Sequence, residues 1–448
     1  MPMRTLESVE ILIPALVGLV LSMFVRRQWR LGRQRPGETT DWRIHPVDFL
    51  VALLVGALYW LIVIRSSFET TEMTEYALLL LAAAFLASTS LTAALVWAGG
   101  RMRSYDTAGS HGHTKAEIRA VPNIGGVAIF WTIALPSLAG VIYLNMLTGE
   151  QAPEALATHL DGVQERTPML LVLLGCLFAL HLIGLVDDRR ALSAWPKLIA
   201  QIVAAFVMVF FFESRLLTML DTAGGLEPLA PWPSVLVSIA WLIVMTNAVN
   251  MLDNMDGLAG GVASIAGILF LVAALLNGQW FVACMLALLV GATLGFLVFN
   301  FPPASIFMGD GGSLVIGFLL GFLTIRTTYF GEAPDTSWYG VFMPVVVLAV
   351  PLYDFLSVVT IRLRQGRKPW VGDQQHFSHR LVEQGLSKRM AVLIIYGCTI
   401  ATGLGGVALA RLEPWQAALV GAQTVVILLV LAIYEHAARR GRRLETRP

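Results

Sequence analysis

Residues 170–189 read LLVLLGCLFALHLIGLVDDR, an apolar run that ends in two aspartates and an arginine. A run of about 20 apolar residues matches the hydrocarbon thickness of a bilayer. The whole chain of 448 residues is 56% hydrophobic and only 14% charged, whereas a soluble globular domain carries about 25% charged residues. The sequence therefore predicts an all-α, polytopic integral membrane protein.

Similar apolar runs recur along the chain and predict about 11 to 13 transmembrane helices. The expected helices cover residues 8–24, 47–64, 76–98, 124–146, 168–186, 197–212, 234–252, 258–276, 279–300, 312–328, 339–361, 390–411 and 415–437.

The distribution of Lys and Arg predicts the orientation of these helices. One set of alternate loops holds 25 of the 31 basic residues, which by the positive-inside rule makes that side cytoplasmic. The net charge of +1 gives no indication of a nucleic-acid partner. The other side holds six, counting helix ends: Arg4, Arg65, Arg166, Arg215, Arg326 and Arg411.

Acidic motifs lie on the predicted cytoplasmic side, although acidic residues were not used to assign it. Asp187 and Asp188 are adjacent carboxylates at a membrane edge, and they need a cation or a shared proton unless they form only a solvated helix end. Asn247, Asn250, Asp253 and Asp256 recur every three residues, which predicts a polar stripe that continues a helix. The alternative for this stripe is a pore-facing surface that binds water.

Two further motifs suit a phosphorylated ligand. The segment from Phe307 to Ser313 reads FMGDGGS, in which glycines permit close backbone approach, a helix start favours anions, and Asp310 offers a hard oxygen ligand. The loop 362–389 contains His376, His379 and Arg380, which would share one side of a short helix. Its other arginines are expected to serve positive-inside anchoring.

Other polar residues carry less information. We expect His181 to be a packing residue, and His111 and His113 to be loop residues. Asp354 lies within a predicted span, where a functional role and a structural partner are equally expected.

Together these motifs predict phosphoryl transfer at a membrane-embedded, cytoplasmic site. Carboxylates with few other ligands suit Mg²⁺, which bridges to substrate phosphates, with Mn²⁺ as an alternative. Basic loop residues suit the phosphates themselves. One substrate would be a lipid and the other a soluble molecule such as a nucleotide.

Five ordered segments within residues 119–389 resemble the polyprenyl-phosphate N-acetylhexosamine-1-phosphate transferase family. They are Val121-Pro122-Asn123-Ile124-Gly125-Gly126, Asp187-Asp188-Arg189, residues 250–261 (NMLDNMDGLAGG), Phe307-Met308-Gly309-Asp310 and Asp373-Gln374-Gln375-His376-Phe377-Ser378-His379. The resemblance favours the branch that takes UDP-linked N-acetylglucosamine, although Ser378 replaces a histidine of that branch's pattern. The alternatives are a phospho-MurNAc-pentapeptide transferase and, in another class, a secondary transporter.

The resemblance implies a role for each matching residue. Asp310, with Asp188, would bind Mg²⁺, and Asp187 would deprotonate or orient the lipid phosphate. Asn250, Asp253 and Asp256 would line the nucleotide pocket, with Phe307 on uracil and Arg119 near the nucleotide. His376, His379 and Arg380 would contact diphosphate or sugar.

The resemblance also implies the products, the location and the organisation of the chain. The products would be UMP and a polyprenyl-diphosphate sugar for cell-surface polysaccharide or cell-wall synthesis. The protein would be a multi-pass protein of the bacterial inner membrane, and a homodimer is left open. We expect residues 1–98 to be accessory helices, 99–411 the catalytic core, and 412–448 the last helix with a basic tail.

Overall fold

A computed structural model of the protein describes residues 72–102, 121–147, 157, 159–216, 232–327, 338–370 and 375–445. The predicted helices 8–24 and 47–64 lie outside the described residues, as do Arg119, Asp373, His111 and His113. The predicted accessory role of residues 1–98 stays a prediction.

The described elements are helices, and four of them (η3, α12, α14 and η4) are short. In chain order, the helices are α3 (Glu72–Met102), α4 (Gly125–Met146), α6 (Leu160–Arg189), α7 (Ala194–Phe211), α8 (Trp232–Leu252), α9 (Leu258–Leu276), α10 (Trp280–Asn300), α11 (Asp310–Arg326), η3 (Trp338–Phe342), α12 (Met343–Val347), α13 (Ala349–Arg364), α14 (Phe377–Glu383), α15 (Lys388–Ala408), η4 (Leu409–Arg411) and α16 (Pro414–Glu445).

The structure confirms the prediction of an all-α, multi-pass membrane protein. Within the described residues, nine helices are long and apolar enough to cross a bilayer, and a bent helix pair adds a tenth. A helix is found at each of the eleven predicted positions from 76–98 onward. α6 begins at Leu160, about two turns before the predicted start at 168, and so shortens the loop expected before it.

The predicted span 339–361 is not one straight helix. Residues Tyr339–Val347 and Ala349–Arg364 are two helical segments bent by 68° at Leu348. Pro344 lies in the first turn of α12 and Pro351 in the first turn of α13, where the missing N–H of a proline costs no helical hydrogen bond. Both prolines therefore fit a new helix start better than the interior of one continuous helix.

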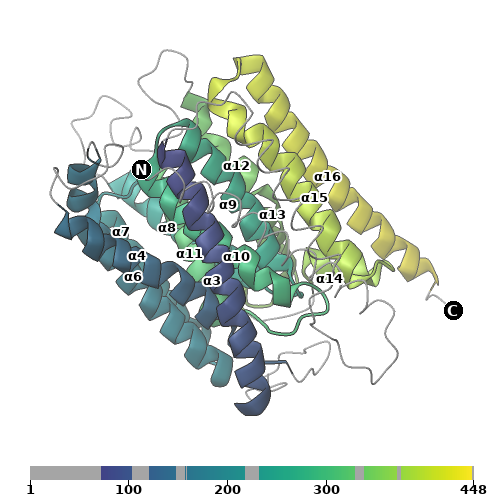
Figure 1. The fold of residues 1–448 in the computed structure, drawn as a ribbon. Helices are drawn as coiled ribbons and strands as arrows, with labels where there is room; N and C mark the ends of the chain where they lie inside the picture. Colours follow the sequence, from purple (N-terminus) through teal and green to yellow (C-terminus); the bar gives the residue numbers. More distant parts are fainter. Residues whose placement is uncertain are drawn as a thin grey trace, which may run out of the picture.

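The helices form a bundle whose centre is α9, α10 and α11 (Figure 1). α4, α6 and α7 lie on one side of this centre, and α15 and α16 form the opposite edge. Gly311–Ile325 of α11 are all buried. By contrast, α16 exposes large apolar side chains such as Leu419, Val426 and Ile433. Exposed apolar side chains on a spanning helix suit contact with lipid, so α11 is the structural axis and α16 a peripheral helix.

Candidate active site

Asp188, near the end of α6, caps the start of α11. Its Oδ1 accepts hydrogen bonds from the backbone N–H of Asp310 (2.9 Å) and from Asn123 Nδ2 (3.0 Å), and its Oδ2 accepts one from the N–H of Gly311 (3.1 Å). The first N–H groups of a helix lack partners within the helix and favour negative charge. Asp188 therefore fixes where α11 begins and how Asp310 is presented.

Glycines allow α4, α6 and α11 to meet at this point without intervening side chains. A Cβ on Gly184 would lie 2.4 Å from the carbonyl carbon of Asp310, and one on Gly126 would lie 2.3 Å from the nitrogen of Gly312. Gly309 has a φ of +69°, and a Cβ there would lie 2.4 Å from Asp188 Oδ2. We call these close contacts the glycine seam; the seam holds the three helix ends in one arrangement.

The segment before α4 is tied to the loop before α11. Phe307 N–H donates to the carbonyl of Pro122 (2.8 Å), and Gly125 N–H donates to the carbonyl of Phe307 (2.9 Å). Phe307 itself is half-buried. These bonds bring the first and fourth family-like motifs, which lie more than 180 residues apart in the sequence, into one site.

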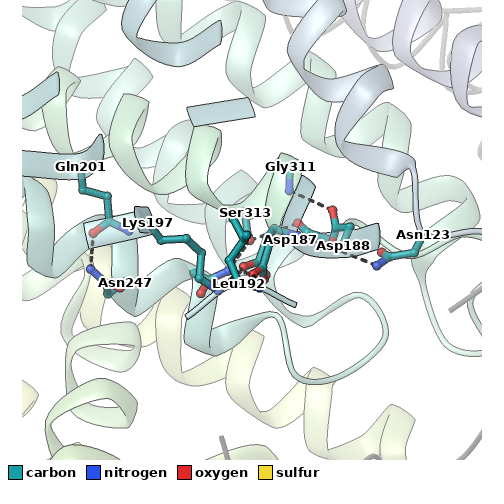
Figure 2. Close-up of polar contacts among 12 residues, drawn as sticks. Asn123, Asp187, Asp188, Leu192, Lys197, Gln201, Asn247, Gly311 and Ser313 are labelled. Atoms are coloured by element: carbon teal, nitrogen blue, oxygen red, sulfur yellow. Dashed lines mark hydrogen bonds and ion pairs between the residues drawn. The ribbon is translucent and has the colours of Figure 1, made fainter. Parts of the chain in front are cut away.

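Lys197 joins two of the predicted carboxylates. Its Nζ lies 2.9 Å from Asp187 Oδ2 and 2.9 Å from Asp310 Oδ2, and Figure 2 shows its side chain directed toward Asp187. Asp187 Oδ1 also accepts a hydrogen bond from the N–H of Leu192 (2.7 Å), in the turn that leads into α7. In the sequence, Lys197 is one of the 25 basic residues on the predicted cytoplasmic side, where a lysine is expected for anchoring alone. Its spacing of ten residues from Asp187 gave no signal of this contact.

The predicted polar stripe of residues 247–256 is not continuous. α8 ends at Leu252, so Asp253 and Asp256 lie in the turn before α9. Asn250 Nδ2 donates to Asp310 Oδ1 and to Ser313 Oγ, at 2.9 Å each. Asn247 instead donates to Gln201 Oε1 on α7 at 2.6 Å (Figure 2). The stripe is interrupted because a new helix, α9, starts after the turn at Gly257, whose φ of +77° favours glycine.

The turn between α8 and α9 still adds acidic groups to the site. Burial, and then the negative charges of Asp310, Asp188 and Asp256, raise the pKa of Asp253 well above its ordinary value. Asp256 Oδ2 accepts a hydrogen bond from the N–H of Ala304 (3.0 Å) and so holds the loop before α11.

The histidine motif is held by Asp354, for which the sequence left both a functional role and a structural partner as alternatives. His376 Nδ1 lies 2.9 Å from Asp354 Oδ2, and the N–H of Phe377 donates to Asp354 Oδ1 (2.6 Å). Both His376 and Asp354 are buried. The carboxylate therefore orients the His376 ring and caps α14 at the same time.

The other two residues of the histidine motif are placed differently. The His379 ring centroid lies 6.4 Å from that of His376. Burial and the nearby His376 lower the pKa of His379 below its ordinary value. Arg380 is buried and its Nη2 donates to Ser357 Oγ at 3.0 Å. The Ser378 hydroxyl donates to Asn254 Oδ1, so α14 contacts the turn that holds Asp253.

The donor set fits a magnesium ion. Asp187 and Asp310 both contact Lys197, Asp188 accepts from the N–H of Asp310, and Asp253 lies close enough to Asp310 and Asp188 for their charges to raise its pKa, so several carboxylates surround a single lysine contact. No three of the described His, Cys, Asp and Glu side chains form a ready metal cage. Mg²⁺ is commonly held by one or two carboxylates, waters and substrate phosphates rather than by a full protein cage, so the carboxylates of Asp188 and Asp310 are compatible with the ion.

His181 confirms its expected packing role. Its Nδ1 lies 2.7 Å from the carbonyl oxygen of Gly311, and its ring stacks on Phe130 with centroids 4.7 Å apart. The residue therefore supports the first turn of α11 through Gly311 and packs against α4 through Phe130.

Comparison with known proteins gives a consistent assignment. The sequence profile of Glycosyl transferase family 4 matches residues 170–328. The chain is 31% identical, over 70% of its length, to the decaprenyl-phosphate N-acetylglucosaminephosphotransferase of Mycolicibacterium smegmatis, covering 78% of that protein. It is 28% identical, over 71% of its length, to the probable undecaprenyl-phosphate N-acetylglucosaminyl 1-phosphate transferase of Bacillus subtilis, covering 81% of that protein.

A relative named for a different sugar matches over a shorter part of the chain. The phospho-N-acetylmuramoyl-pentapeptide-transferase of Levilactobacillus brevis is 28% identical over 61% of the chain. The carboxylate cluster, the membrane fold and the extent of these matches agree: the chain is a membrane phosphotransferase of glycosyl transferase family 4, in the family of polyprenyl-phosphate N-acetylhexosamine-1-phosphate transferases.

Proposed function

We propose that the protein transfers N-acetylglucosamine-1-phosphate from UDP-N-acetylglucosamine to a polyprenyl phosphate. An oxygen of the lipid phosphate forms a bond to the β-phosphorus, and the bond from this phosphorus to the bridging oxygen breaks, which releases UMP. The arrangement of Asp187, Lys197 and Asp310 at the end of membrane helices carries the proposal. The names of the relatives in Bacillus and Mycolicibacterium support the same sugar and lipid class.

Lys197 is suited to contact the diphosphate. An ammonium group has three N–H donors, and two of them are directed to Asp187 and Asp310. The third is left for a phosphate oxygen. Asp187 is held by Lys197 and by the N–H of Leu192. It is therefore placed to orient the lipid phosphate or to accept its proton.

Asp310, together with Asp188, would hold Mg²⁺. The bound cation supplies charge neutralisation at the transferring phosphate. Asn250 and Asp188 position Asp310 from its side-chain and backbone ends respectively. The protein's own contribution is therefore a carboxylate whose orientation is set before substrate arrives.

An apolar groove supports the assignment of a lipid substrate. It has a volume of about 720 Å³ and runs between α12, α13 and α16. Its lining is largely apolar, with Leu356 and Val425 as exposed examples, and it includes Ser357 and Arg380. A buried guanidinium beside an apolar groove suits a lipid whose head carries a phosphate. The contact of Ser378 with Asn254 links this groove to the turn of Asp253.

The proposal also covers which membrane the protein occupies and on which side of it the site lies. The excess of Lys and Arg in the loops on the side of Asp187 and Asp310 supports a cytoplasmic site in the bacterial inner membrane. A soluble nucleotide sugar would reach the carboxylates from that side.

The test is UMP release by the purified full-length protein with undecaprenyl phosphate, Mg²⁺ and a panel of UDP-sugars. We expect UMP with UDP-N-acetylglucosamine and none when the cation is chelated. An absence of UMP with every UDP-N-acetylhexosamine would overturn the proposal. Release only with UDP-MurNAc-pentapeptide would keep the reaction but replace the sugar.

A further inference from the structure

A second cavity lies at the ends of α6 and α11 remote from the carboxylates. Its volume is about 460 Å³. Among its lining residues are His159, Arg166, Gln279, Trp280 and Arg326. We call it the distal cavity; nothing in the proposed reaction uses it.

The distal cavity and the carboxylate cluster are at opposite ends of the same helix. α11 has 17 residues, of which Asp310 is the first and Arg326 the last, so it spans about 25 Å at 1.5 Å per residue. α6 likewise carries Arg166 near its start and Asp187 near its end. The cavity therefore faces the other side of the membrane.

The lining of the distal cavity is basic. It includes two arginines and a histidine, and among the described residues no Asp or Glu lines it. Asp161 and Glu165 lie nearby on α6 but are exposed and do not line it. Arg166 lies close enough to Arg326 for their like charges to repel. Within the described part of the chain, no hydrogen bond or ion pair is found for either guanidinium.

Ordinary helix electrostatics explain one arginine but not both. Arg326 lies in the last turn of α11, where a cation is favoured. Arg166 lies in the second turn of α6, near the end that favours anions, and therefore gains nothing from the helix dipole. Two cations facing one cavity repel, and an anion between them would relieve this repulsion.

We propose that the distal cavity binds a phosphate-type anion, with Arg166 and Arg326 as its main contacts. Guanidinium groups pair with phosphate oxygens through parallel N–H donors. Trp280 and the apolar Val141 and Phe281 also line the cavity, so it can accept a phosphate that is joined to lipid chains. The same chemistry could come from a soluble phosphate, and the experiment separates the two sources.

The experiment uses the full-length protein in a neutral detergent. Its thermal midpoint is followed while short-chain phosphatidylglycerol, short-chain phosphatidylcholine or inorganic phosphate is added, because a ligand of the folded state raises the midpoint. We expect phosphatidylglycerol or phosphate to raise it, and phosphatidylcholine to act more weakly. A rise with phosphatidylglycerol alone identifies a lipid head group. An equal rise with inorganic phosphate identifies a soluble anion.

Variants locate the effect. R166Q/R326Q should raise the apparent Kd of the active probe by at least about tenfold. R411Q is the matched control, since Arg411 is exposed and its guanidinium contacts the end of α9 on the same side. It should leave the Kd unchanged. R166E reverses the charge of an exposed side chain and should abolish the shift even if the double variant does not fold.

Two results would overturn the proposal. One is the absence of any shift with both phosphatidylglycerol and phosphate in the unmodified protein. The other is a full shift in R166E. A variant-free check is the addition of NaCl from about 50 to about 500 mM, which should weaken an ion-pair contact; an unchanged shift would also contradict it.

Discussion

The two ends of the α6–α11 pair hold their charges in different ways. At one end, Asp188 accepts three hydrogen bonds, and Asp187 and Asp310 accept two each. At the other end, no hydrogen bond or ion pair to described residues is found for Arg166 and Arg326. Charges held by fixed partners are oriented before a substrate arrives, which suits catalysis. Charges without partners suit a site that is completed by its ligand.

The largest expected effect is at the carboxylate end. D310N removes a charge but keeps the shape of the side chain. We expect UMP release to fall by at least about 10³-fold, because oriented charge at the transferring phosphate is lost. UMP release is measured on protein of normal yield and size-exclusion profile.

A matched control for D310N lies at the distal end of α6. Asp161 is an exposed carboxylate in the first turn of that helix, and D161N should retain full activity. Near-normal turnover by D310N would contradict the assigned role of this carboxylate.

The second-largest effect is expected at Lys197, whose ammonium group contacts two carboxylates. K197M leaves Asp187 and Asp310 without this ammonium group between them, and we expect a decrease in UMP release of about 10²-fold. Binding of Mn²⁺, measured by calorimetry, should become tighter because the site becomes more negative.

Lys368 provides the control for K197M. It is exposed in a neighbouring loop and lies over the ring of Trp370. K368M should change neither turnover nor Mn²⁺ affinity. Equal losses in the two variants would show that Lys197 acts only through general surface charge.

The third effect tests the glycine seam. G184A places a Cβ 2.4 Å from the backbone of Asp310, so α6 and α11 must separate. We expect destabilisation by about 1–3 kcal/mol and an activity loss of about tenfold. Thermal midpoint and UMP release are measured together.

Gly175, on the same helix, offers the matched position. A Cβ there has no atom within 4 Å, so G175A should leave both quantities near normal. If G184A behaved like G175A, the seam would not determine the position of Asp310.

The smallest effect is expected at the distal end. In the absence of an added anion, R166Q should change the thermal midpoint by less than about 2 °C, because Arg166 is exposed and has no hydrogen-bond or ion-pair partner among the described residues. The midpoint in neutral detergent gives the measurement. A large decrease would show that Arg166 has a structural role and would remove the contrast between the two ends.

Much of the fold follows from hydropathy. Apolar runs predicted all the long described helices, since spanning a bilayer imposes one length and one secondary structure. The bend at Leu348 was not predicted, because Val345, Val346 and Val347 continue the apolar pattern across it. Hydropathy reports burial in lipid but not the direction of a helix.

The site was only partly predictable. The carboxylates at helix ends were predicted as site residues because a charge near the membrane is costly unless it is paired or used in function. Lys197 was not predicted as a site residue, because the positive-inside rule already accounts for a lysine at a helix end on the predicted cytoplasmic side. Likewise, the regular spacing from Asn247 to Asp256 suggested one helix. The left-handed backbone of Gly257, which ends that regularity, is a property of the folded turn.

The glycine seam has a consequence for inhibitors. Close backbone contact at Gly126, Gly184 and Gly309 leaves no space for a side chain, so a mutation that adds one there also displaces Asp188 or the start of α11. A compound that recognises the backbone around Gly311 would therefore bind where resistance mutations carry a loss of activity. A compound that relies on the groove beside α16 would meet exposed apolar residues such as Val425, which the protein can exchange at little cost.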